Sequence, residues 1–263
     1  MLAYLAVCIS ALLVAALTLF SGFGLGTLLL PAFALFFPVE LAVAATAVVH
    51  FLNNLFKLGL VGRNADARIA LVFGLPGVAL SLLGAWVLTR VSGVPAIRSY
   101  VIGGQQHDVT AVKLVIGGLM IGFAVLDLAP ALRKLEFGRR WLPVGGALSG
   151  FFGGVSGHQG ALRAAFLAKV GLTPSAFIGT NVVCAVMVDT ARLVIYGLAF
   201  VGGHFLAVRQ AGIGGLILAG TLSAFVGSYL GARLSRSMTL ESLHLILGVM
   251  LIGIGVALGT GLI

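Results

Sequence analysis

The sequence predicts an all-α polytopic membrane protein with about eight helical segments in two inverted four-segment repeats. Three observations lead to this fold class. Hydrophobic residues make up 60% of the 263-residue chain and charged residues only 9%, whereas about a quarter of an ordinary soluble domain is charged. Apolar runs long enough to cross a bilayer follow one another along the chain. The chain also carries an internal duplication, which is described below.

The apolar runs define the individual segments. A helix needs about 20 apolar residues to cross the hydrocarbon core. Six runs fit a single crossing, namely 41–61, 69–90, 112–129, 175–200, 210–232 and 242–261. Two further regions, 2–37 and 142–172, are too long for one helix and contain glycine-rich breaks. We therefore expect the first segment of each repeat to be broken or re-entrant.

The two breaks begin an internal repeat. Ser21-Gly22-Phe23 opens the first glycine-rich stretch, and Ser149-Gly150-Phe151 is taken as its counterpart. Each is followed by a proline and a helix that begins with threonine. The sequence thus predicts a first transmembrane repeat (1–130), a charged linker (131–141) and a second transmembrane repeat (142–263).

Charge counts favour re-entrant breaks. If each broken region crosses the membrane once, the basic residues divide seven to six between the two sides. If each enters and returns, the repeats become inverted and the division is nine to four. The positive-inside rule prefers the second arrangement, with both termini outside the cytoplasm. The nine are Arg63, Arg68, Arg133, Lys134, Arg139, Arg140, Lys169, Arg233 and Arg236, and the four are Arg90, Arg98, Lys113 and Arg209.

The basic balance of +9 does not indicate a nucleic-acid partner, because the charges lie in short gaps between apolar runs and form no basic face. The two cysteines, Cys8 and Cys184, lie in apolar runs and suggest neither a disulfide framework nor a metal cluster. We expect no cofactor and no metal. The sequence leaves the oligomeric state open.

Polar residues inside the predicted spans are the first guide to a site, because they usually face a helix bundle or a wet cavity. Thr46, His50, Asn53 and Lys57 form a stripe on one helical face, with Asn54 beside it. The stripe indicates a substrate-lining face for Thr46, His50 and Asn53. A hydrogen-bonded seam between helices is the alternative, with Lys57 extending to the basic side.

The matching helix of the second half carries Thr180, Asn181, Cys184, Asp189 and Arg192. Asp189 and Arg192 are three residues apart and can form an internal ion pair. Thr180 and Asn181 lie near the start of the helix and are better candidates for substrate binding.

The second break carries a polar insert. Gly154, Ser156, His158 and Gln159 precede Arg163. Glycines let backbone N–H groups approach a ligand, and the N-terminus of a half-helix favours an anion. The first break offers a poorer counterpart without charge, formed by Gly24, Gly26 and Thr27. Close helix packing is the alternative explanation for the glycines.

These motifs resemble the TauE/SafE sulfite exporter family. The matching residues are Ser21-Gly22-Phe23-Gly24-Leu25-Gly26-Thr27 with Leu30-Pro31 and Ala45-Thr46, which recur as Gly150-Phe151-Phe152-Gly153-Gly154-Val155-Ser156-Gly157 and Gly179-Thr180-Asn181. The resemblance implies a secondary carrier for small sulfur-containing anions such as sulfite or sulfoacetate. It also implies export or proton-coupled movement across a prokaryotic inner membrane. Two departures concern the substrate: Leu25 and Thr27 interrupt the first glycine run, and His158-Gln159 replaces small residues in the second.

The residues predict alternating access around an anion site at the repeat interface. Hydroxyl and amide groups would bind the oxygens of the anion, while His50, His158 and Arg163 supply positive charge. His50 or His158 could couple transport to protons. An intramembrane serine hydrolase is the alternative from another class, with Ser156 as nucleophile and His50 or His244 as base. An anion channel is a further alternative. A cation carrier fits less well, because Asp189 is the only carboxylate well inside a span and has Arg192 beside it.

Overall fold

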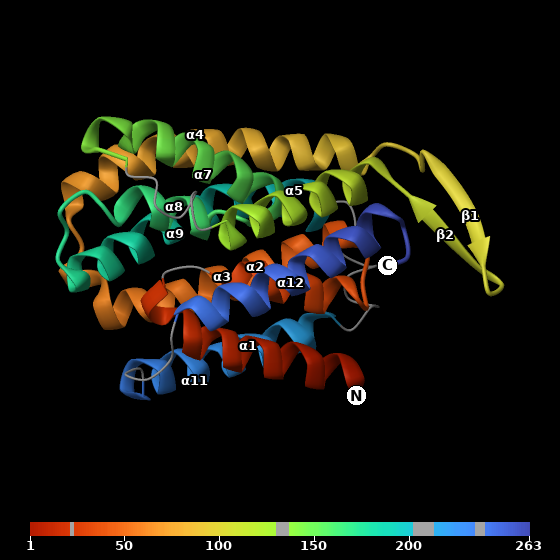
Figure 1. Cartoon of the computed structure of the whole chain (residues 1–263), viewed down its shortest axis with the longest axis horizontal. Coiled ribbons are helices and arrows are strands. Elements are labelled where there is room, and N and C mark those ends of the chain that lie inside the picture. Colours follow the sequence, from red (N-terminus) through yellow and green to blue (C-terminus); the bar gives the residue numbers. More distant parts are fainter. Residues whose placement is uncertain (22–23, 130–136, 202–212, 235–239) are drawn as a thin grey trace.

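The computed structural model describes residues 1–21, 24–129, 137–201, 213–234 and 240–263. Within these ranges the chain is an all-α membrane protein with one short β-hairpin (Figure 1). The first part of the chain forms α1 (Leu2–Ser21), α2 (Leu25–Ala34), α3 (Val39–Val61), the short 3₁₀ helix η1 (Gly62–Asn64), α4 (Ala67–Ser92), β1 (Arg98–Ile102), β2 (Gln105–Val109) and α5 (Ala111–Leu128). The second part forms η2 (Arg139–Trp141), α7 (Leu142–Ser156), α8 (Gly160–Leu167), α9 (Pro174–Tyr196), the π-helical η3 (Gly197–Val201), α11 (Ile213–Leu234) and α12 (Leu240–Gly259).

The six runs predicted to cross once correspond to α3, α4, α5, α9 with η3, α11 and α12. Four helical stretches, Val39–Asn64, Ala67–Ser92, Pro174–Ala199 and Ile213–Arg233, are long and apolar enough to span a bilayer. The two regions that were too long for one helix are broken as expected, into α1 and α2 and into α7 and α8. The predicted linker 131–141 lies partly outside the described residues.

Equivalent elements recur at a constant spacing. The first residues of α3 and α9 are 135 positions apart, Val39 and Pro174, and so are their last residues, Val61 and Tyr196. The starts of α2 and α8, Leu25 and Gly160, have the same separation. The packing repeats as well, because α4 packs along α7 as α11 packs along α1.

The equivalent helices run in opposite directions, as inverted repeats require. His50 in the middle of α3 contacts Asp189 in α9, while Gly179 near the start of α9 packs on Val61 at the end of α3. The helices α5 and α12 contact each other reciprocally. A Cβ atom on Gly117 would lie 2.5 Å from the carbonyl oxygen of Gly255, and one on Gly255 would lie 2.8 Å from that of Gly117.

The broken segments turn back on themselves. The N-terminal end of α2 lies at mid-length of α3, since Gly26 is next to His50, and its C-terminal end leads directly into the start of α3. The helix α2 therefore runs antiparallel to α3. The helix α1 runs in the same direction as α3, because both are parallel to α11. Along α11, Gly227 and then Gly231 contact Leu12 and then Ala16 of α1. In the same order, Gly220 and then Ser228 contact Val49 and then Asn53 of α3. Each half thus has one helical hairpin and three further long helices, the arrangement of the re-entrant alternative.

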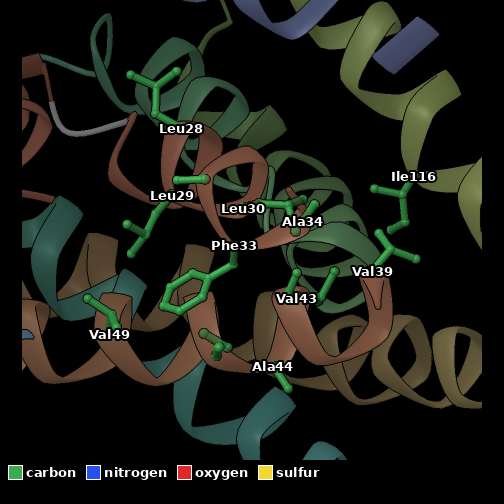
Figure 2. Packing of buried hydrophobic residues seen from close by; sticks show 14 of the residues in the cluster. Leu28, Leu29, Leu30, Phe33, Ala34, Val39, Val43, Ala44, Val49 and Ile116 are labelled. Atoms are coloured by element: carbon green, nitrogen blue, oxygen red, sulfur yellow. The ribbon is translucent and has the colours of Figure 1, made fainter. Parts of the chain in front are cut away.

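The apolar core lies around α2. Leu29 and Phe33 of α2 belong to one buried cluster with Val43 and Val49 of α3 (Figure 2). The helix α2 is buried almost throughout, although it is only ten residues long. Because α2 is buried on all sides, its sequence is apolar all round. The same packing fixes the position of the hairpin turn between α1 and α2 within the bundle.

The structure corrects the register of the duplicated motif. Helix α1 ends at Ser21 and α7 ends at Ser156, so the counterpart of Ser21 is Ser156 rather than Ser149. The stretch Ser149-Gly150-Phe151 lies inside α7. Its glycine serves close packing, because a Cβ on Gly150 would lie 2.0 Å from the carbonyl oxygen of Gly77 in α4. The sequence match was wrong because a packing glycine resembles a hinge glycine in the sequence.

The β-hairpin was not predicted. Its turn is formed by Gly103 and Gly104, both with positive φ, as a two-residue hairpin requires. The hydroxyl of Tyr100 donates a hydrogen bond to the carbonyl of Thr260 near the C-terminus. In the same hairpin, a hydrogen bond with Ser99 holds the pKa of the Asp108 carboxyl below its ordinary value.

Both termini and the hairpin lie at one end of the bundle (Figure 1). Among the described residues, this end carries Arg90, Arg98 and Lys113. The opposite end, where α3 and α11 finish and α7 and α9 begin, carries Arg63, Arg68, Arg139, Arg140, Lys169 and Arg233. The remaining basic residues of the count, Arg133, Lys134, Arg209 and Arg236, lie outside the described residues.

Candidate functional site

Close packing between α4 and α7 fixes the position of the second break. Gly146, Gly150 and Gly154 lie four residues apart on one face of α7 and meet the backbone carbonyls of Phe73, Gly77 and Ser81. Any larger side chain on this face would collide with backbone, since a Cβ on Gly154 would lie 2.3 Å from the Ser81 carbonyl oxygen. Gly154 was predicted to contact substrate. In the structure it packs against the Ser81 carbonyl in the contact between α7 and α4.

The break itself spans only three residues. Gly157 ends α7 in the left-handed conformation with φ of 82°, which glycine adopts without steric cost. His158 and Gln159 follow, and α8 begins at Gly160. The Ser149 hydroxyl donates a hydrogen bond to the Gln159 carbonyl. The polar insert is therefore buried and held in place from both sides.

Asp189 is the centre of the buried polar cluster. One carboxylate oxygen lies 2.6 Å from Nδ1 of His50 and accepts from Asn54 at 3.3 Å. The other accepts from Gln159 at 2.7 Å and from Nε of Arg192 at 2.9 Å. The ion pair expected between Asp189 and Arg192 is present, and both side chains are fully buried.

The contact between His50 and Asp189 joins the two halves. His50 lies on α3 and Asp189 on α9, at the point where these antiparallel helices cross. Asn54 reaches the same carboxylate from α3. A charged pair buried in this way holds its geometry tightly, because removal of one partner leaves an uncompensated charge.

Arg163 lies one helical turn into α8. Its guanidinium donates to Oδ1 of Asn181 and to Oε1 of Gln159, so α8, α9 and the break are linked through one side chain. Only 2% of Arg163 is exposed. The structure thus brings His50, Gln159, Arg163, Asn181, Asp189 and Arg192 into one hydrogen-bonded network, hereafter called the central cluster.

Positive charge predominates around the central cluster. Lys57, Arg163 and Arg192 are each buried to 95% or more, whereas Asp189 is the only buried carboxylate among the described residues. Lys57 lies one turn beyond Asn53 on α3 and close enough to Arg163 for their charges to interact. Buried cations of this kind stabilise an anion placed among them.

The first break meets the second at this cluster. Gly24 precedes α2 with φ of 120°, a conformation that requires glycine. A Cβ on Gly26 would lie 3.3 Å from the Gly157 carbonyl oxygen and 3.6 Å from the His50 ring. The N-terminus of α2 therefore lies against both the other break and the polar helix α3. Thr27 follows in the first turn of α2 and is partly buried.

Ser156 and His158 form a separate contact at the end of α7. Nδ1 of His158 lies 3.0 Å from the Ser156 hydroxyl, and the imidazole ring stacks on Phe123 of α5. The Ser156 hydroxyl also donates a hydrogen bond to the Phe152 carbonyl. His158 lies only two residues from Ser156 and stacks on Phe123, so this contact does not select the hydrolase alternative. His50 is engaged with Asp189 instead, and the side chain of His244 lies outside the described residues.

The other predicted residues lie around the cluster. Thr180 is tied to the loop before α4, because its hydroxyl accepts a hydrogen bond from the Asp66 N–H. Oδ1 of Asn53 accepts from Ser228 of α11. The Thr46 hydroxyl and the Asn53 amide nitrogen are buried without a hydrogen-bond partner among the described residues. The buried thiol of Cys184 makes a long contact of 3.8 Å with the Ala70 carbonyl.

Two residues of the site were not selected from the sequence: Tyr196 donates a hydrogen bond to the Gly154 carbonyl, and Ser228 donates to Asn53. Asn54 was noted beside the polar stripe but not assigned to the site, and it bonds Asp189. The 135-residue spacing was the available signal, since it pairs Asn54 with Asp189 and Lys57 with Arg192. Among the described residues, no group of three or more His, Cys, Asp and Glu side chains is arranged to hold a metal ion.

Inverted halves whose broken helices meet at a buried polar centre are the plan of many secondary transporters. Comparison with known families matches residues 7–258 to the family described as Sulfite exporter TauE/SafE. The chain belongs to this family and is a multi-pass membrane transporter. No curated protein and no solved structure matches the chain.

Proposed function

We propose that this protein is a secondary transporter that moves a small sulfur-containing anion, sulfite or an organosulfonate such as sulfoacetate, by alternating access. The observation that carries the proposal is the central cluster, where buried cations outnumber carboxylates at the crossing of α3 and α9. A small oxyanion needs many donors and little apolar wall. His50, Gln159, Asn181 and the arginines supply these donors, and the sulfite exporter family supports a sulfur anion as cargo.

The two half-helices support the same conclusion. The first backbone N–H groups of α2 and α8 have no partners within their own helices, and the helix dipoles favour negative charge at these ends. Both N-termini lie at the central cluster, α2 through Gly26 and α8 through Gln159. Anion sites at the N-termini of broken helices recur in secondary transporters.

The packing supports a particular alternating-access motion. Backbone-to-backbone glycine contacts tie α7 to α4 and α1 to α11, so each pair would move as one unit. At mid-length, where His50 meets Asp189, the crossing of α3 and α9 is held by polar side chains, whereas Gly179 packs on the Val61 backbone near the helix ends. Polar side chains can exchange partners more easily than packed backbone can move. We place the conformational change at this crossing.

The basic residues support an orientation in a prokaryotic inner membrane. The end opposite the termini carries twice as many described Lys and Arg residues as the end with the hairpin. The positive-inside rule makes it cytoplasmic and places both termini in the periplasm or outside the cell. We further propose export from the cytoplasm and coupling to protons.

Transport of radiolabelled sulfite into proteoliposomes tests the proposal. Liposomes with purified protein and preloaded with unlabelled sulfite are expected to accumulate label faster than liposomes loaded with chloride, because a carrier exchanges substrate across the membrane. Arg163→Gln is expected to lower the rate at least ~10-fold, since a buried charged hydrogen bond contributes about 1.5–3 kcal/mol.

Arg68→Gln is the matched control, because Arg68 is exposed at the start of α4 and should leave the rate unchanged. With the membrane potential clamped at zero, the same assay distinguishes the carrier from the channel alternative, since a channel then shows no stimulation by preloaded substrate. Equal accumulation with and without preloaded sulfite and sulfoacetate would overturn the proposal.

A further inference from the structure

We propose that the Asp189 carboxylate occupies the oxyanion-binding groups of the empty carrier, and that substrate displaces it when Asp189 takes up one proton. This inference rests on the proposed function and adds to it the identity of the proton site. The carboxylate then competes with the substrate for the same hydrogen-bond donors.

The donors around Asp189 carry the inference. Four side chains from three segments converge on its two oxygens: His50 and Asn54 from α3, Gln159 from the break, and Arg192 from α9. The closest contacts are 2.6 Å to His50 and 2.7 Å to Gln159. A carboxylate and a sulfonyl group both present two or more acceptor oxygens on one atom. The groups that hold Asp189 are therefore those that a sulfite or sulfonate anion requires.

Electrostatics prevents an anion and an ionised Asp189 from sharing these groups. Like charges a few ångströms apart repel strongly in a buried site. A proton on Asp189 removes its charge and allows Arg192 and His50 to turn to the arriving anion. An acid group of the anion then replaces the carboxylate beside Arg192 and Arg163. A singly charged anion leaves the total charge of the cluster unchanged, and doubly charged sulfoacetate adds one negative charge to it.

The proton balance follows from this exchange. Asp189 takes one proton from the side to which the site is open, and the anion binds to the groups that the carboxylate releases. When the site opens to the other side, the anion leaves, Asp189 gives up the proton there, and the carboxylate returns to its donors. One proton therefore moves in the same direction as each anion. The charged or titratable groups that face Asp189 are His50, Arg163 and Arg192.

Comparison of equivalent positions in the two inverted halves supports Asp189 as the proton-binding residue. Asn54 is 135 residues earlier, at the equivalent place on α3, and is an amide that cannot take up a proton at this position. The second histidine considered for coupling, His158, contacts Ser156 and Phe123 instead. Among the described residues, the second half therefore supplies the buried carboxylate on which donors from both halves converge.

The test measures the binding of sulfoacetate to the purified full-length protein at about pH 6, pH 7 and pH 8. Both acid groups of sulfoacetate stay ionised in this range, since ordinary carboxyl groups titrate near pH 4. If one proton is bound with each anion, the wild-type dissociation constant rises about 10-fold per pH unit. In Asp189→Asn it should change less than ~2-fold over the whole range, because the amide carries no titrating proton.

Asp108→Asn is the matched control, since Asp108 is a carboxylate of the β-hairpin far from the central cluster in the sequence and fold (Figure 1), and it should keep the wild-type slope. In liposomes with a trapped pH indicator, sulfoacetate influx should acidify the lumen with wild-type protein and with Asp108→Asn. Asp189→Asn should transport sulfoacetate without this acidification. For a protein that accepts sulfite alone, the same titration is made with sulfite after correction for its own ionisation.

Two results would overturn the inference: a wild-type dissociation constant that does not depend on pH, or a slope that persists in Asp189→Asn. A slope lost in His50→Gln and kept in Asp189→Asn would assign the proton to His50 and overturn it as well. If Asp189→Asn fails to fold, the His50→Gln slope decides the matter, because a proton on Asp189 predicts that the slope persists in this variant. Failure of the proposed function has a different signature, because the wild-type protein would then bind neither sulfite nor sulfoacetate at any pH.

Discussion

The two broken segments share a scaffold and differ in chemistry. At equivalent positions 135 residues apart, the first half has Gly24, Leu28 and Thr46, and the second has Gln159, Arg163 and Asn181. The second set forms a hydrogen-bonded chain through the guanidinium of Arg163. The first set forms none, and the Thr46 hydroxyl is buried without a partner among the described residues. Duplication thus provides the hairpin and its depth, while substitutions in one copy provide the charge.

The difference between the halves also explains why the Thr46 hydroxyl has no hydrogen-bond partner among the described residues. The side chain that would meet Thr46 in a fully symmetric molecule is that of Leu28, which cannot donate or accept a hydrogen bond. The second half has both partners, Arg163 and Asn181, whereas the first half has only the hydroxyl. The difference suggests that the first break supplies backbone N–H groups and close packing, whereas the second supplies the selective side chains.

The largest effect is expected where the two halves differ in packing. Gly150 of α7 and Ala15 of α1 are equivalent, yet a Cβ on Gly150 would lie 2.0 Å from the Gly77 carbonyl oxygen. Gly150→Ala should destabilise the protein by about 3 kcal/mol or more, because backbone has to move. Ala15→Gly should cost only about 1 kcal/mol. Thermal unfolding in detergent measures both, and equal melting temperatures would contradict the packing difference.

The second comparison concerns charge. Arg163→Gln should lower sulfite exchange at least ~10-fold through loss of a charged donor. Leu28→Ala, at the equivalent position, should lower the melting temperature through loss of a buried side chain, about 2–5 kcal/mol, and change the apparent affinity for sulfite less than ~3-fold. Concentration-dependent uptake separates the two effects. An affinity that falls equally in both variants would mean that both breaks bind the anion alike.

The third comparison concerns the hydrogen-bond partner. Asn181→Leu removes the acceptor of the Arg163 Nε–H and should destabilise the protein by about 1–3 kcal/mol. Thr46→Val removes a hydroxyl that has no partner among the described residues and should leave stability unchanged or raise it by about 1 kcal/mol. Melting temperatures at matched detergent concentration measure the difference. A lower melting temperature for Thr46→Val would show that its hydroxyl is engaged.

The smallest effect is expected at the two serines that face the polar helices. Ser228 of α11 donates to the Asn53 side chain, and Ser81 of α4 donates to the Val188 carbonyl. Ser228→Ala should cost about 1–2 kcal/mol, because it leaves a buried amide oxygen without its donor. Ser81→Ala should cost less than about 1 kcal/mol, since a helix carbonyl keeps its backbone partner. The order of the two melting temperatures tests this point.

Much of the fold could be predicted from the sequence. The length of an apolar run indicates whether a helix can span the membrane, and the polar stripe from Thr46 to Lys57 indicates a helix face buried in the protein. The pair Asp189 and Arg192 followed from a spacing of three on a helix. The repeat register did not follow, since Gly150 and Gly157 look alike in the sequence although one packs and the other turns. Contacts such as Ser228 with Asn53 depend on which helices are neighbours, and local patterns do not contain this information.

The most direct test of the central claim is counterflow of radiolabelled sulfite in proteoliposomes, with wild-type protein compared with Arg163→Gln and Leu28→Ala. We predict label accumulation that depends on preloaded sulfite, a rate of accumulation at least ~10-fold lower in Arg163→Gln, and an apparent affinity for sulfite close to wild type in Leu28→Ala. Accumulation that is unaffected by Arg163→Gln would contradict an anion site in the second break.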